Sequence, residues 1–282
     1  ENGWEPPKTW DETMALCEKA KAKDKYLFVW GKEASLYWSW LALDMAVKDA
    51  GLDVWRNIAN LKEDAWSHPS VIASFEAIED SVKQGCWIPG GEGTHYTLAQ
   101  TKWSLDQQAL MYSSGSWIAQ EMKEVTADDF QMTAWPYPTL RSESAIPFGS
   151  VQVDPGGQYV VPAEGANTAG AMEILRAWLS KDAAAKWAET TESPSVVKDS
   201  VPADGFGSTA LLSTVQVMDQ AGENQHAFFL SYMDFTDLGD VLVNVFNQFL
   251  GGQISSAEAL SQLQDAHDEV REDDSLIKRV WE

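Results

Sequence analysis

Two short apolar runs, each followed by small residues and then by an aromatic helix start, constrain the fold most strongly. Residues 109–117 read Ala-Leu-Met-Tyr-Ser-Ser-Gly-Ser-Trp, which predicts a buried strand, a sharp turn and an indole at its end. Residues 26–30 predict a second buried strand, which Gly31 separates from an aromatic helix start at Tyr37. Because ligands of open α/β sheets lie at the carboxyl ends of strands, both features can face one cleft if their strands share a sheet.

Trp117 allows two interpretations from its local sequence. An indole held at a turn offers a flat apolar face and one N–H donor, which suits a pyranose ring. The small residues before it, Gly115 and Ser116 among them, leave backbone amides and hydroxyls free for polar contacts. The same Trp can equally be a core residue at the start of a helix, and the local sequence does not separate the two.

Charge and length exclude several classes of protein. The 282 residues include 43 acidic and 20 basic side chains, so the formal net charge is -23. Such a balance argues against a nucleic-acid or anionic-membrane surface, because both need basic residues. The chain is long enough for two lobes, and its apolar runs are shorter than the roughly 20 residues of a membrane span.

Residues that could carry chemistry form no recognisable pattern. The four histidines are scattered without ligand spacing, and no nucleophile motif is present, so we expect no metal, no cofactor and no catalytic activity. A glycosidase needs only two suitably placed carboxylates, which the many acidic residues leave open as an alternative. Cys17 and Cys86 belong to no disulfide framework or CxxC pair, and we expect each to pack as a small apolar residue.

Helices are expected over much of the chain. Thr9 with Glu12 forms a capping box that predicts a helix to about residue 23. Trp178 and Trp187 lie on apolar stripes of two later helices, and we expect them to pack in a core. The remaining predicted helices cover 67–85, 94–107, 167–181, 182–190, 207–221, 236–250 and 255–270. Further strands are predicted at 130–138 and 158–162, with 141–157 as a segment that crosses between lobes.

Several separated motifs resemble one family in their order along the chain. They are Pro-Pro-Lys-Thr-Trp-Asp-Glu at 6–12, Ser-Gly-Ser-Trp at 114–117, and the run from Gln-Tyr-Val-Val-Pro at 158–162 to Ala183-Ala184 and Ser193-Pro194. These motifs are similar to those of the extracellular solute-binding proteins of carbohydrate ABC importers, the relatives of maltose-binding protein. Residues 111–117, 121–123 and 129–133 resemble the members that bind N-acetylglucosamine and chitobiose.

The resemblance implies an α/β fold of the periplasmic-binding-protein type II, with two lobes that close on a sugar. Residues 1–146 would form the first part of the C-terminal lobe, 147–200 the hinge crossing and the returning segment of the N-terminal lobe, and 201–282 helices that pack on the C-terminal lobe. Most of the N-terminal lobe would then precede residue 1. Since residue 1 is not Met, we expect this chain to be part of a longer one.

The resemblance also implies ligand contacts. Trp117 and Tyr37 match the stacking aromatics, Gln158 matches a polar group that bonds a ring hydroxyl or an acetamide, and Tyr232 and Asp234 compete with Phe235 for a further aromatic position. Two more candidates come from position alone. Trp30 ends a predicted strand and is assigned to the cleft rather than to the core, and Glu33 is either a sugar contact or a solvated loop carboxylate.

The expected function is that of a sugar-binding subunit of an ABC importer. Its ligand would be an N-acetylated amino sugar or a short oligosaccharide, and its partners the transmembrane permease subunits, with no nucleic acid. We expect a monomer that works in the extracellular or periplasmic space, held at the membrane as a lipoprotein in its full-length form. The alternatives are a carbohydrate-active hydrolase and a fragment without binding activity.

Overall fold

Two parallel strands form the centre of the largest packed part of the protein. The computed structural model describes residues 2–153, 159–226 and 235–281. Strand β1 (Tyr26–Val29) pairs with β2 (Ala109–Tyr112), with Tyr26 opposite Ala109 and Val29 opposite Tyr112. Since the strands are parallel, their carboxyl ends lie at one edge, as the two sequence features predict.

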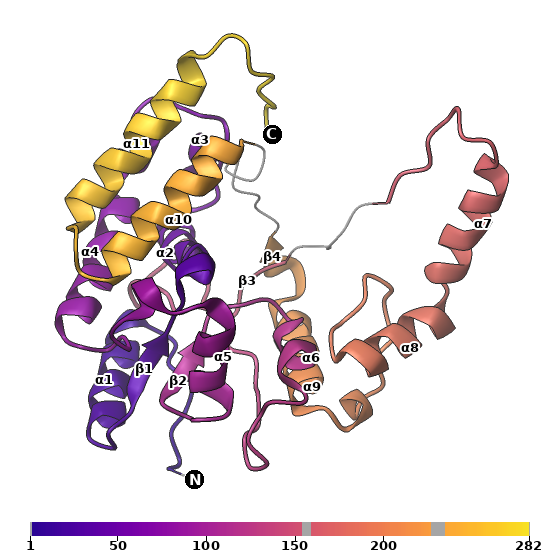
Figure 1. Ribbon diagram of the computed structural model, residues 1–282, viewed down its shortest axis with the longest axis horizontal. Helices are drawn as coiled ribbons and strands as arrows, with labels where there is room; N and C mark the ends of the chain where they lie inside the picture. Colours follow the sequence, from indigo (N-terminus) through magenta and orange to yellow (C-terminus); the bar gives the residue numbers. More distant parts are fainter. Residues whose placement is uncertain (1, 154–158, 227–234, 282) are drawn as a thin grey trace.

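Helices from the N-terminal part of the chain contact this pair, and the C-terminal helices lie beyond them (Figure 1). Helix α11 packs along α10 and also contacts α4, so the C-terminal helices are built onto the N-terminal part of the chain. The helices of this part are α1 (Trp10–Lys21), α2 (Tyr37–Ala50), α3 (Asp53–Ala59), α4 (Pro69–Lys83), α5 (Tyr96–Ser104), α6 (Ile118–Met122), α10 (Thr236–Leu250) and α11 (Ser256–Glu272). Short 3-10 turns are η1 (Lys32–Ala34), η2 (Ala65–Ser67), η3 (Gly91–Gly93), η4 (Gly205–Gly207) and η5 (Gly222–Asn224).

Capping residues explain where several helices begin. The Thr9 hydroxyl accepts a hydrogen bond from the Glu12 N–H, while the Glu12 carboxylate accepts one from the Lys8 N–H at 2.7 Å. Ser255 and Glu258 form a reciprocal capping box at the start of α11. The helix predicted from the Thr9 cap is therefore confirmed. The helix predicted at 255–270 from its apolar residues is also present as α11, and α10 has the predicted bounds.

The described residues between 151 and 226 form a second part, in which few side chains are buried. Strand β3 (Val151–Gln152) pairs in parallel with β4 (Gln225–His226), and the helices are α7 (Thr168–Trp178), α8 (Lys181–Thr191) and α9 (Thr209–Ala221). In Figure 1, α6 and α9 lie between the β1–β2 pair and the α7–α8 pair. These two-residue strands have no apolar pattern, which is why the sequence did not predict them.

Trp178 and Trp187 do not lie in a core, so that expectation is wrong. Their side chains are 48% and 45% exposed, and their ring centroids are 5.8 Å apart. No residue of α7 is buried, although the helix has a clear apolar stripe. The physical reason is that no described element covers this face, so the two indoles shield each other.

Both predicted strands of the middle region are absent from the described structure. Residues 130–138 run without a ladder, because Pro136 and Pro138 have no N–H to donate, and only the bridge between Thr9 and Thr139 forms beyond them. Residues 159–162 adopt no strand either, and Gln158 lies outside the described residues.

Cys17 and Cys86 form a disulfide, which corrects the expectation that they are separate thiols. Their Cα atoms are 5.6 Å apart, and both residues are completely buried. Strand β1 brings the two cysteines together. Leu27 N and Phe28 N on this strand both donate to the Cys86 carbonyl, and α1, which carries Cys17, packs against the same strand. A sequence separation of 69 residues hides this contact from local patterns.

A buried ion pair connects α2 to the second part of the chain. Lys48 Nζ lies 2.7 Å from Asp44 Oδ2 and donates to the Tyr137 carbonyl at 2.7 Å. His226 Nε2, on β4, lies 3.2 Å from Asp44 Oδ1. Burial of both charges is compensated by the mutual contact and by these hydrogen bonds.

In the part of the chain that the structure describes, every helix is too short or too polar to cross a lipid bilayer.

Candidate binding site

Three aromatic rings meet where β1 and β2 end. The ring centroids of Tyr37 and Trp117 are 6.1 Å apart at an interplanar angle of 61°. The ring centroids of Tyr37 and Trp40 are 4.7 Å apart. Tyr37 opens α2 and Trp117 immediately precedes α6, so each ring is held at the start of a helix. We call Tyr37, Trp40 and Trp117 the aromatic shelf. The two predicted aromatic positions are therefore brought together at one edge.

The Trp117 ring packs directly against Gly115. A Cβ atom at Gly115 would lie 1.9 Å from Cζ3 of Trp117, so the indole rests directly on the glycine backbone. Ser116 lies in the turn that follows, which closes through a hydrogen bond from Ile118 N to Gly115 O at 3.1 Å. Trp117 is nevertheless 42% exposed. One side of the ring is fixed while part of its surface faces solvent.

Ser113 fixes the backbone of Tyr37 relative to the end of β2. Its hydroxyl donates to the Tyr37 carbonyl at 2.8 Å and lies 2.6 Å from the Tyr137 hydroxyl. Since the serine proton goes to the carbonyl, the Tyr137 hydroxyl donates to Ser113 Oγ. Burial raises the pKa of Tyr137, which keeps this phenol protonated and able to donate. The start of α2 is thereby connected to the end of β2.

Acidic groups border the shelf. Burial raises the pKa of Tyr37, and the nearby charge of Glu121 and the phenol of Tyr96 raise it further. Gln100 on α5 donates to Glu121 Oε2 at 2.9 Å. Glu33 Oε2 accepts from Tyr96 N at 3.2 Å, so this carboxylate caps the start of α5. The surroundings suit a neutral ligand that donates hydrogen bonds.

Trp30 is part of the core, and its assignment to the cleft is wrong. Its side chain is 1% exposed and lies beneath the loop that contains Gly91, where an added Cβ would be 2.2 Å from Trp30 Cε2. A strand end is ambiguous in sequence because the covering loop comes about sixty residues later. Gln158, Tyr232 and Asp234 lie outside the described residues.

Sequence reasoning missed two residues at the shelf. Glu121 lies four positions after Trp117, a spacing that places two side chains on one face of a helix and was available in the sequence. Gln100 carries no such signal, because its contact with Glu121 depends on how α5 packs against α6.

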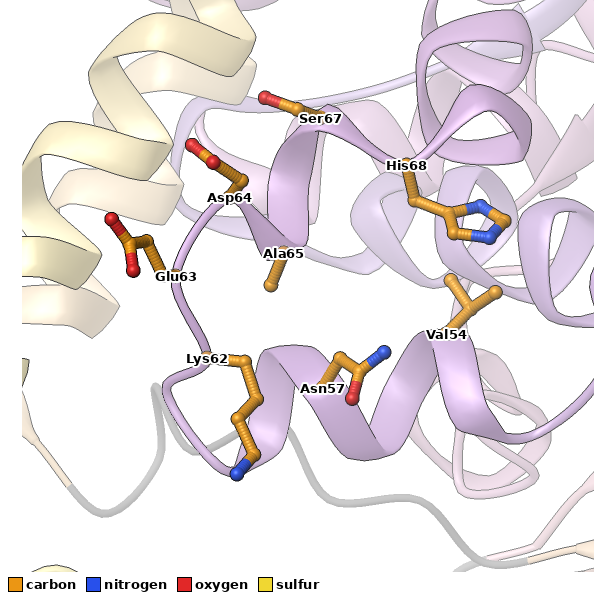
Figure 2. Close-up of a pocket in the computed structure, with 8 residues that line it drawn as sticks. All are labelled: Val54, Asn57, Lys62, Glu63, Asp64, Ala65, Ser67 and His68. Carbon is orange, nitrogen blue, oxygen red and sulfur yellow. The ribbon is translucent and has the colours of Figure 1, made fainter.

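The shelf is separate from a hollow of about 410 Å³ beside α3. Figure 2 shows that Glu63 and Lys62 at its rim point in different directions rather than toward a common centre. His68 in the same hollow is occupied as a helix cap, since its Nδ1 accepts from Ser70 N at 3.2 Å. In the described ranges, no group of three or more His, Cys, Asp or Glu residues is arranged to hold a metal ion.

Comparison with known proteins supports a single family. The family model described as "Bacterial extracellular solute-binding protein" matches residues 1–214. The diacetylchitobiose binding protein NgcE of Streptomyces coelicolor is 45% identical over 278 residues, which are 99% of this chain and 59% of that protein.

Two solved structures share the fold. A chitin oligosaccharide binding protein superposes with a TM-score of 0.71 at 18% identity, covering 94% of this chain and 65% of the other. A protein from work on xylan utilization by the thermophilic bacterium Caldanaerobius polysaccharolyticus gives 0.70 at 17% identity, covering 92% and 65%. The chain spans less than two thirds of the length of these relatives. The fold is the α/β fold of the solute-binding proteins, and the chain belongs to the bacterial extracellular solute-binding protein family.

Proposed function

We propose that this protein is the sugar-binding subunit of an ABC importer and that it captures an N-acetylated amino sugar or a short oligosaccharide on the aromatic shelf. The observation that carries the proposal is the meeting of Tyr37 and Trp117 at 6.1 Å, with Trp117 partly exposed. A pyranose has apolar C–H faces that stack on such rings. A relative at 45% identity is named for diacetylchitobiose binding, which supports this class of ligand.

The protein binds its ligand without chemical conversion. The family and the relative are both described as binding proteins, which supports a role without catalysis. Affinity then comes from ring stacking and a few hydrogen bonds. Micromolar binding needs only about 8 kcal/mol in total.

The same family supports a division of the chain between two lobes. Residues 1–146 form the first part of one lobe, 147–200 cross to a second lobe, and 201–282 return to pack on the first. Helix α7, in which no residue is buried, lies in the segment assigned to the second lobe. The protein works as a monomer in the extracellular or periplasmic space, is held at the membrane by a lipid, and delivers its sugar to permease subunits.

Calorimetric titration of the full natural protein tests the function. The ligands are N-acetylglucosamine, diacetylchitobiose and maltose. Trp117→Ala should weaken binding roughly fivefold or more. Trp187→Ala, which removes an exposed indole that is not part of the shelf, should bind as the wild type does. Absence of heat with every sugar, or full affinity in Trp117→Ala, would overturn the proposal. Release of cleaved product from a chromogenic glycoside would favour a hydrolase instead.

A further inference from the structure

The carboxylate of Glu121 lies beside the aromatic shelf, and only one of its two oxygens accepts a hydrogen bond from a described residue. Glu121 lies on α6, and its N–H donates to the Trp117 carbonyl at 3.1 Å. The two side chains are four residues apart and therefore project from the same side of the helix. The Glu121 side chain is exposed. A ligand stacked on the indole thus lies within reach of this carboxylate.

The orientation of Glu121 is fixed by a buried amide. Gln100 is 4% exposed, and its Nε2 donates to Glu121 Oε2 at 2.9 Å. Within the described residues, Oε1 of Glu121 receives no hydrogen bond and no cation lies within ion-pair distance of the carboxylate. One oxygen is used to hold the group in place, and the other remains available as a charged acceptor.

The charge of Glu121 acts on the rings of the site. Burial is the largest cause that raises the pKa of Tyr37, and the charge of Glu121 is the second largest. The same charge also raises the pKa of Tyr112. Its field therefore covers the same surface on which the ring of a ligand would lie. A negative charge in this position favours O–H and N–H donors and repels anionic groups.

We propose that Glu121 determines ligand specificity at the shelf. It accepts a hydrogen bond through Oε1 from a hydroxyl or amide N–H of a neutral saccharide stacked on Trp117, and it discriminates against saccharides that carry a carboxylate, such as uronic acids. Gln100 is a positioning residue that holds the carboxylate toward the shelf. The inference rests on the proposed function, because it requires that a sugar binds at the aromatic shelf.

The matched control is Glu124, an exposed acid that follows α6. Glu121→Gln and Glu124→Gln remove the same charge from the protein, so any effect of net charge is equal in the two variants. Diacetylchitobiose serves as the neutral ligand and a glucuronate-containing disaccharide as the anionic one, both followed by calorimetry. Ultraviolet titration of the tyrosines gives a readout that needs no sugar.

Loss of a hydrogen bond to a charged group weakens binding roughly tenfold or more, so Glu121→Gln should bind diacetylchitobiose at least tenfold less tightly. Its preference for the neutral over the anionic ligand should shrink, and Tyr37 should ionise at a lower pH. Gln100→Leu should weaken binding by less, and it should add nothing in the double variant with Glu121→Gln. Glu124→Gln should match the wild type.

Two outcomes overturn the inference in distinguishable ways. If the wild type binds diacetylchitobiose and Glu121→Gln binds it with equal affinity and equal preference, the role of Glu121 is wrong while the proposed function stands. If the wild type binds neither disaccharide nor any other sugar, the proposed function fails and the role of Glu121 fails with it.

Discussion

Lys48 and Asp44 form an ion pair with Nζ and Oδ2 2.7 Å apart and with neither side chain open to solvent. The pair lies on α2, the helix that also begins with Tyr37 of the shelf. Through His226 and the Tyr137 carbonyl it also contacts β4 and the segment before residue 139. The helix that carries Tyr37 is thereby linked to the second part of the chain through the contact between Asp44 and His226.

Removal of one charge from this pair should be severely destabilising. Lys48→Met keeps the aliphatic length but leaves Asp44 charged in the interior, which costs about 3–5 kcal/mol of unfolding free energy. Urea unfolding followed by tryptophan fluorescence measures the loss. The double variant Asp44→Leu with Lys48→Met should regain most of it, because no unpaired charge remains. Equal stability of Lys48→Met and the wild type would contradict the prediction.

Gly115→Ala should weaken sugar binding without unfolding the protein. The added Cβ would overlap the Trp117 ring at 1.9 Å, so the indole must leave its support. Loss of a well-placed stacking ring costs about 1 kcal/mol, or roughly fivefold in affinity. Calorimetry measures the affinity, and near-ultraviolet circular dichroism reports the indole. Gly149→Ala is the control, since a Cβ at that position would contact nothing within 4 Å.

Reduction of the Cys17–Cys86 bond should lower stability substantially. The bond closes a loop of 69 residues, and the chain-entropy model then gives about 4 kcal/mol. Thermal unfolding with and without reductant, and of the variant with both cysteines replaced by Ala, measures this contribution. If reductant lowers the melting temperature of that Ala variant as much as that of the wild type, the loss does not come from this bond.

Acid should weaken the contact between α4 and α11. Hydrogen bonds from Lys83 and Ser256 lower the pKa of Glu79 to about 2, from an ordinary value of 4.5. Because the pKa is lower in the folded state, the contribution to stability is complete above about pH 4.5 and is lost as the pH falls toward about 2. Between pH 6 and pH 2.5, the urea concentration at the midpoint of unfolding should fall less steeply in Glu79→Gln than in the wild type. Glu76→Gln, exposed on the same helix, should keep the wild-type slope.

Local signals in the sequence predicted the helices and the two strands of the centre. Thr9 is a cap whose partner lies three residues away, so a short window contains the whole interaction. The helix that begins near Ser255 was predicted from its apolar residues, which also lie within a short window. Tyr37 and Trp117 could be found because each follows an apolar run and a small-residue turn. Their meeting required only that the two strands be parallel neighbours.

Features that depend on distant partners could not be predicted. The disulfide requires β1 to bring α1 and Cys86 together, and the burial of Trp30 requires the loop at Gly91. The apolar stripe that contains Trp178 predicted a helix correctly, but a stripe does not say whether another element covers it. The hydrogen bond from Gln100 to Glu121 likewise forms only because α5 packs against α6.

The bond between Cys17 and Cys86 turns residues 17–86 into a covalent ring that includes Tyr37 and Trp40. A protease that cuts once anywhere inside this ring yields two polypeptides that still migrate as one molecule on a non-reducing gel. The same cut outside the ring releases a free fragment. Two of the three shelf residues therefore lie in a segment whose ends stay joined after a single cut.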